Sequence, residues 1–168
     1  MSDYVHALMA AAGPLLDQPP VSDPQLYRRA VDGLSVERLA SPAGGVPTLV
    51  HGDLCRKNML FKDFGVYLID WSDAVVGPGW LALAGLAPVL VAEGHEPGKA
   101  DQYLHDASPV WARAHADDVA AMAALISLRH WARAAQESDP LYQQDAQALA
   151  QAGWEWLRYR MGAVTSRP

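Results

Sequence analysis

Cysteine and long apolar runs are scarce in this chain of 168 residues. The single cysteine, Cys55, excludes an internal disulfide framework and favours a reducing, cytoplasmic location. No uninterrupted apolar stretch reaches about 18 residues, and no basic segment precedes an apolar one near the start. The sequence therefore predicts neither a membrane span nor a signal peptide. The net charge of −6 argues against nucleic acid as a partner.

The bulk composition is that of one globular domain, with 51% apolar and 19% charged residues. We expect a single domain over 1–168, with leading helices in 1–45, a motif-bearing segment in 46–84 and a helical remainder in 85–168. Helix-start signals and apolar periodicity support this division. They are Ser22-Asp23-Pro24, the buried-helix pattern Trp80 to Val91, the run from Asp117-Asp118 to Gln136, and Ser138-Asp139-Pro140.

The most informative residues follow an apolar run that ends at Val50. There the chain reads His51-Gly52-Asp53, and Asn58 comes five residues after the aspartate. A second aspartate, Asp70, closes the next apolar run. A carboxylate base, combined with an Asn and an Asp that can share a divalent cation, is the set of groups that kinase-type phosphoryl transfer uses.

Two short β-prone runs, Met59 to Phe61 and Val66 to Ile69, flank a turn-like stretch that ends in glycine. If this hairpin is centred on Phe64, Asn58 and Asp70 face each other across its open end, with Cβ atoms roughly 4.5–5.5 Å apart. One Mg²⁺ could then take an oxygen from each side chain. Asp53 lies on the loop that enters the same end, where it could accept a proton from an attacking hydroxyl.

The joined motifs resemble those of the aminoglycoside phosphotransferase and choline kinase-like family, which is related to the protein kinases. They read His51-Gly52-Asp53-Leu54 with Asn58 and Leu60, then Leu68-Ile69-Asp70-Trp71-Ser72-Asp73-Ala74 with Gly77-Pro78. The resemblance implies an α+β, mostly α-helical fold: a protein-kinase-like C-terminal lobe with a small β-hairpin at the catalytic loop. It also implies transfer of the γ-phosphate of ATP to a small-molecule hydroxyl.

The same resemblance implies roles for four residues. Asp53 would be the catalytic base and His51 a loop-shaping residue of the catalytic site, whereas Asn58 and Asp70 would bind Mg²⁺ and, through it, the ATP cofactor. In the related kinases, helices of this lobe line the acceptor pocket with carboxylates. The candidates here are Asp101, Asp106, Glu137, Asp139 and Asp145, and the net negative charge agrees with an acceptor such as an aminoglycoside, a choline-like cation or a sugar.

Two departures from the family pattern limit this expectation. Ala82 stands where an aspartate usually buttresses the catalytic loop. The family's N-terminal lobe also has no counterpart, because the chain lacks a G-x-G-x-x-G loop and its lysines, Lys57, Lys62 and Lys99, all follow Asp53. We therefore expect the chain alone to transfer phosphate poorly. We also expect the apolar surface that such a lobe would cover to lie open and to favour a homodimer.

Two other functional classes remain open from the sequence. A non-catalytic remnant, or pseudo-kinase lobe, would bind a ligand or a partner protein without transferring phosphate. A metal-dependent phosphoesterase is suggested by the string His51-Gly52-Asp53, although such enzymes need further His and Asp ligands at strand ends. A nucleotide-dependent heat signal with Mg²⁺ would separate the phosphotransferase from the non-catalytic remnant, and metal-dependent ester hydrolysis without ATP would indicate the phosphoesterase.

Overall fold

In the computed structural model, residues 2–17, 20–35 and 47–165 are described, and they form a mostly helical fold with two small antiparallel sheets. The helices are α1 (Ser2–Asp17), α2 (Pro24–Asp32), α4 (Trp80–Ala92), α5 (Pro97–Ala107), α6 (Pro109–Ala112), α7 (Ala116–Gln136) and α8 (Pro140–Thr165). The strands are β1 (Pro47–Val50), β2 (Met59–Lys62), β3 (Gly65–Leu68) and β4 (Val75–Pro78), with a short 3-10 turn, η2 (Arg56–Asn58), before β2.

The predicted α+β, mostly α-helical fold class is confirmed by these elements. The further predictions of a kinase-like lobe and of a single domain stay predictions. Helices α1 and α2 occupy the described part of the segment 1–45, whereas residues 36–46 lie outside the described residues.

Helices α2 and α8 begin where the sequence predicts them, and α7 begins one residue earlier. The Asp23 side chain accepts a hydrogen bond from the backbone N–H of Leu26 at 3.2 Å, and Pro24 follows it in the first turn of α2. This is the arrangement that stabilises a helix N-terminus, because the cap satisfies an otherwise unpaired N–H. Asp117 and Asp118 lie in the first turn of α7, where carboxylates oppose the helix dipole.

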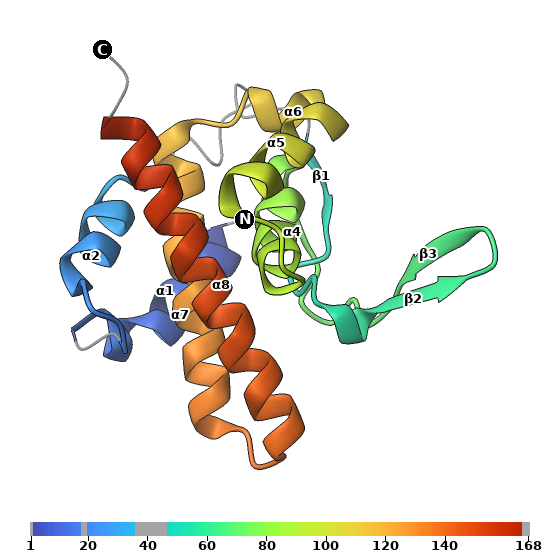
Figure 1. The fold of residues 1–168 in the computed structure, drawn as a ribbon, viewed down its shortest axis with the longest axis horizontal. Helices are drawn as coiled ribbons and strands as arrows, with labels where there is room; N and C mark the ends of the chain where they lie inside the picture. Colours follow the sequence, from blue (N-terminus) through green and yellow to red (C-terminus); the bar gives the residue numbers. More distant parts are fainter. Residues whose placement is uncertain (1, 18–19, 36–46, 166–168) are drawn as a thin grey trace.

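Helix α7 is central to the core, and α1, α2, α4 and α8 pack around it (Figure 1). The α7 side chains from Val119 to Leu128 are buried. Within this core, the Tyr27 hydroxyl of α2 and the Ser127 hydroxyl of α7 are hydrogen-bonded at 2.5 Å, and the Tyr27 ring stacks on Trp154 of α8. These contacts fix the position of α7 in the core, and thereby the position of the side chains on its last turns.

Strands β1 and β4 form a sheet that the sequence did not predict. The register pairs Val50 with Val75, which sets the residues after β1 beside the residues before β4. The two predicted motifs are thereby joined at this sheet, because one motif begins where β1 ends and the other ends where β4 begins.

The predicted hairpin between Asn58 and Asp70 is confirmed, but its predicted register is wrong by one residue. Lys62 pairs with Gly65, so the turn consists of Asp63 and Phe64 and is not centred on Phe64. Continuing this register places Asn58 opposite Ile69, and the Ile69 N–H donates to the Asn58 carbonyl at 3.0 Å. Asp70 therefore lies one residue beyond the position that faces Asn58.

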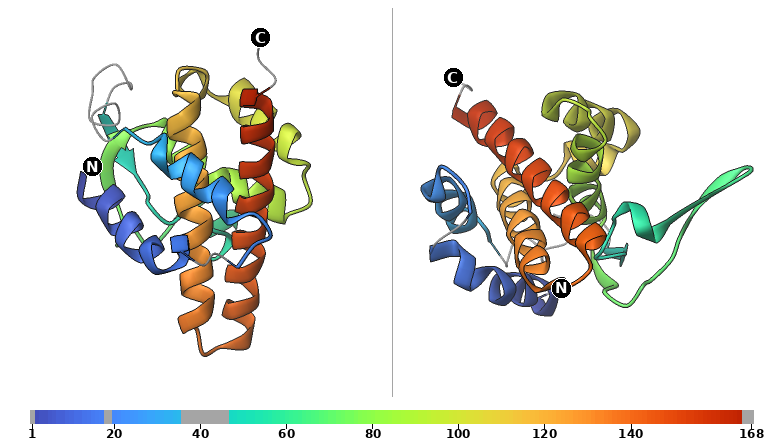
Figure 2. Two further views of the ribbon diagram at one scale, coloured as in Figure 1. Left: turned by 90° about the vertical axis from the view of Figure 1, so that its left-hand side faces the viewer. Right: turned by 60° about the horizontal axis from the view of Figure 1, so that its bottom comes forward.

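The β2–β3 hairpin projects from the helical body (Figures 1 and 2) and carries exposed apolar side chains, namely Leu60, Phe61, Phe64, Val66 and Tyr67. The expectation of an open apolar surface that favours a homodimer stays a prediction. The most apolar helix, α4, has only 13 residues. Within the described ranges, no helix combines the length and hydropathy needed to cross a membrane.

Candidate active site

The loop that follows β1 approaches the chain before β4 very closely. Gly52 has φ +81°, in the left-handed region that favours glycine. A Cβ placed on Gly52 would lie 2.0 Å from the Asp73 carbonyl oxygen, far inside any allowed contact. The register of β1 and β4 continues into this contact, because Val50 pairs with Val75. Only a glycine lets the two motifs meet here.

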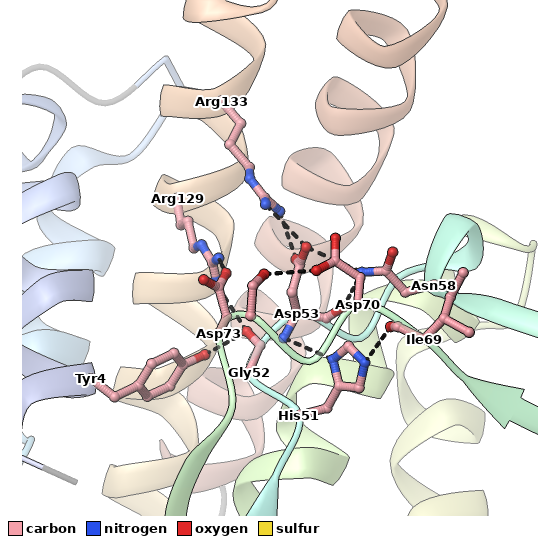
Figure 3. Close-up of polar contacts among 11 residues, drawn as sticks. Tyr4, His51, Gly52, Asp53, Asn58, Ile69, Asp70, Asp73, Arg129 and Arg133 are labelled. Carbon is pink, nitrogen blue, oxygen red and sulfur yellow. Dashed lines mark hydrogen bonds and ion pairs between the residues drawn. The ribbon is translucent and has the colours of Figure 1, made fainter.

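Two helices hold the Gly52 carbonyl (Figure 3). The Tyr4 hydroxyl of α1 donates to it at 2.9 Å, and Arg129 of α7 donates to it at 2.8 Å. The Arg129 guanidinium also pairs with the Asp73 carboxylate. Ala82, at the position of the expected aspartate, is half-buried against the core. The loop is thus supported from α1 and α7, without a carboxylate at position 82.

We expect Arg129→Ala to loosen the loop and to lower the free energy of unfolding by about 1–3 kcal/mol, since it leaves the partly buried Asp73 carboxylate unpaired. Hydrogen exchange of the Asp53 amide should accelerate together with this loss. Arg160→Ala is the matched control. Arg160 also pairs with an aspartate, Asp101, at an N···O distance of 3.0 Å, but this pair lies away from the loop. Equal Asp53 exchange in both variants would contradict a role for Arg129 in the loop.

His51 is buried and joins both motifs. Its Nδ1 accepts the Asp53 N–H at 3.4 Å, so the ring proton lies on Nε2, which donates to the Ile69 carbonyl at 2.8 Å. The ring also lies 4.7 Å from that of Trp71. These contacts tie the conformation of the 51–53 loop to the base of the hairpin, as expected for a loop-shaping residue.

Asp53 is buried and forms a bidentate ion pair with Arg133 of α7. The Arg133 nitrogens lie 2.6 Å from Oδ1 and 3.0 Å from Oδ2. Asn58 Nδ2 donates to the Asp53 carbonyl at 2.9 Å and to Oδ2 at 3.3 Å. Burial raises the pKa of Asp53, but the hydrogen bonds and charge of Arg133 outweigh it, so this pKa lies below its ordinary value. Asp53 is therefore ionised at neutral pH.

Asp70 is exposed at the base of the hairpin and has φ +58°, an uncommon conformation for a residue other than glycine. Its Oδ1 accepts a hydrogen bond from the Ser72 hydroxyl at 2.7 Å, and the Ser72 side chain and backbone lower the pKa of Asp70. Asp53 and Asp70 interact electrostatically, and Figure 3 shows both with Asn58 at one place. Unusual backbone conformations of this kind concentrate at functional sites.

The donor set at this place suits a hard cation. The Asn58 nitrogen is used by Asp53, and its amide oxygen accepts no hydrogen bond from the described residues. That oxygen and the ionised Asp70 carboxylate are ligands of the type that Mg²⁺ prefers. No cluster of three or more His, Cys, Asp or Glu side chains suited to a metal occurs among the residues that the structure describes. Mg²⁺ in proteins usually keeps several waters and binds substrate phosphates, so one or two protein side chains are enough to hold it.

A cavity of about 440 Å³ is lined by Arg133, whose guanidinium pairs with Asp53. Residues of the segment after β1, of α7, of α8 and of the connection between these helices line it: Cys55, Lys57, His130, Arg133, Gln136, Glu137, Tyr142, Asp145, Ala146 and Leu149. Of the acidic candidates from the sequence, Glu137 and Asp145 line this cavity. Asp101 pairs instead with Arg160, Asp106 accepts from Gln102, and Asp139 accepts from the Leu141 N–H at the start of α8.

Three residues of the site were not predicted from the sequence: Tyr4, Arg129 and Arg133. The two arginines are four residues apart and so share one face of α7. That spacing, in an otherwise apolar helix, was the available signal for a buried polar partner. Nothing in the sequence around Tyr4 indicates its contact with Gly52.

A family model described as the phosphotransferase enzyme family matches residues 3–125, which is more than two thirds of the chain. Neither a curated protein nor a solved structure matches the chain. The matched residues include Asp53, Asn58 and Asp70 but not Arg129 or Arg133. By this match over most of its length, the chain belongs to the phosphotransferase enzyme family.

Proposed function

We propose that this protein transfers the γ-phosphate of ATP to the hydroxyl of a small molecule such as an aminoglycoside, a choline-like compound or a sugar, with Mg²⁺, in the cytoplasm. The observation that carries the proposal is the meeting of Asp53, Asn58 and Asp70, together with the pairing of Asp53 with Arg133, which lines a cavity of about 440 Å³. Membership of the phosphotransferase family supports the reaction type.

The residues have distinct tasks in this proposal. An acceptor in the cavity beside Arg133 presents its hydroxyl to Asp53, which takes the proton as the hydroxyl oxygen bonds to the γ-phosphorus and the bond to ADP breaks. Asn58 and Asp70 would hold Mg²⁺, which neutralises charge on the phosphates. His51 and Arg129 keep the loop in place, since correct positioning supplies much of the rate.

The test is transfer of labelled γ-phosphate to a panel of aminoglycosides, choline, homoserine and sugars, with and without Mg²⁺. We expect Mg²⁺-dependent transfer that weakens at least tenfold in Asp70→Asn. Asparagine is chosen because it tolerates the positive φ and removes only the charge. Asp63→Asn, in the exposed turn of the hairpin, is the control and should behave like the wild type.

Other outcomes identify the alternatives. Binding of Mg·ATP without transfer to any acceptor would indicate a non-catalytic, ligand-binding lobe. Metal-dependent hydrolysis of a simple phosphate ester in the absence of ATP would indicate a phosphoesterase. Transfer that is equal in Asp70→Asn and in the wild type would place the metal elsewhere.

A further inference from the structure

The cavity that Arg133 lines carries charges of both signs. His130 and Arg133 lie one turn apart on one face of α7, and Glu137 caps the C-terminus of that helix. One end lies at the loop after β1, where Cys55 packs with Leu149 of α8. The other end lies near the connection from α7 to α8, where Glu137 and Tyr142 line the wall. Arg133 thus brings positive charge next to Asp53, and the carboxylates of Glu137 and Asp145 lie elsewhere on the wall.

Arg133 has hydrogen-bonding capacity beyond its pair with Asp53. Two of its terminal nitrogens contact the Asp53 carboxylate, and a guanidinium carries five N–H donors in all. The Arg133 side chain is 36% exposed, whereas that of Asp53 is 8% exposed. Because Arg133 also lines the cavity, its remaining donors can reach a bound molecule. Lys57 adds a second positive charge to the same wall.

The histidine in the cavity wall is neutral. His130 is 6% exposed and lines the cavity. Burial, with the positive charges of Arg133 and Arg129, lowers the pKa of His130 to about 3. Its ring therefore adds no charge at neutral pH and can hydrogen-bond a hydroxyl. A purely cationic acceptor that lies next to Arg133 would have to place its charge beside a cation, which is unfavourable.

We propose that Arg133 binds an acidic group of the acceptor, and that the acceptor is a small zwitterion. Its acid lies next to the accepting hydroxyl, and its ammonium group lies toward Glu137 and Asp145. Both carboxylates line the same cavity as Arg133, with Glu137 at the C-cap of α7 and Asp145 on α8. This inference rests on the proposed phosphotransferase function and names the substrate class of its cavity.

The test compares binding of matched compounds by calorimetry without nucleotide. Carnitine and choline are one pair, and homoserine and 3-aminopropanol are another; in each, only the first member has a carboxylate. We expect the acid-bearing member to bind at least tenfold more tightly, because its carboxylate can accept charge-assisted hydrogen bonds from Arg133. Arg133→Gln should abolish this preference and Arg133→Lys should keep part of it. Arg56→Gln, which removes an exposed arginine outside the cavity, should retain it.

Several results would overturn the proposal. If no acid-bearing member binds more tightly than its partner, or if the preference survives Arg133→Gln in a folded variant, Arg133 does not bind the acceptor. Mg·ATP binding that weakens in Arg133→Gln, with acceptor binding unchanged, would assign Arg133 to a nucleotide phosphate instead. Phosphate transfer to choline alone would refute the zwitterion and leave the phosphotransferase function intact. Acid-selective binding without any phosphate transfer would refute the phosphotransferase function and leave the acid-binding role of Arg133 intact.

Discussion

Phosphate transfer should fall by a factor of about 10²–10⁴ when Asp53 is replaced with asparagine, which is the usual contribution of a general base. The substitution keeps the shape of the side chain and its contact with Asn58 but removes the proton acceptor. The ion pair with Arg133 is lost as well, although Arg133 is partly exposed and can be hydrated. Single-turnover transfer from labelled ATP, with protein in excess, is the measurement, because it detects even slow chemistry.

The control for this experiment must also lose a bidentate ion pair. Asp101→Asn does so, since both Asp101 oxygens lie 3.0 Å from Arg160, between α5 and α8 and outside the cavity. We expect it to cost stability but not rate. A rate that is the same in Asp53→Asn and the wild type would exclude Asp53 as the base. Equal losses in both variants would mean that the effect comes from folding.

The pH dependence of transfer follows from the same ion pair. The pKa of Asp53 is lowered, so the carboxylate stays ionised down to below about pH 4, the ordinary value of an aspartate. The stabilisation from its pair with Arg133 is likewise present above that ordinary value and is lost as the pH falls through the lowered one. Between pH 5 and 8, any change in rate must therefore come from a group other than Asp53.

The sequence predicted the helices well because their ends depend on neighbouring residues. Asp23 and Pro24 start α2, and Pro140 starts α8, through contacts within a turn or two. It also predicted the hairpin, because β-prone runs flank a short turn. The register was missed by one residue, since the sequence alone did not decide whether Phe64 is the centre of the turn or its second residue.

The contacts that complete the site are distant in sequence, and for this reason the residues alone did not predict them. The sheet of β1 and β4 joins segments that lie on either side of the whole hairpin, and β1 begins with Pro47, which weakens its strand pattern. Arg129 and Arg133 reach the loop from a helix that begins more than sixty residues later. Their spacing marks a shared face, but only the packing of α7 shows what that face contacts.

The strongest effect on stability is expected for Gly52→Ala. The new Cβ would lie 2.0 Å from the Asp73 carbonyl oxygen, which is backbone and cannot rotate away. The positive φ adds strain for any other residue. We expect a loss of at least about 3 kcal/mol in the free energy of unfolding, measured by denaturant titration. Movement of Asp73 would also disturb its pair with Arg129 and the nearby Asp70, so Mg²⁺ binding should weaken.

Alanine substitutions at two other glycines distinguish the backbone strain from the steric clash as causes of this loss. Gly94 has φ +97° with no atom within 4 Å of its Cβ position, so Gly94→Ala measures the backbone strain alone, about 1 kcal/mol. Gly65 has neither a positive φ nor a near neighbour, and Gly65→Ala should change stability by less than about 0.5 kcal/mol. If Gly52→Ala lowers the free energy of unfolding no more than Gly94→Ala does, the backbone near Asp73 can move to accommodate the new Cβ at little energetic cost. The two motifs would then be held together by Arg129 and His51, not by the close contact at Gly52.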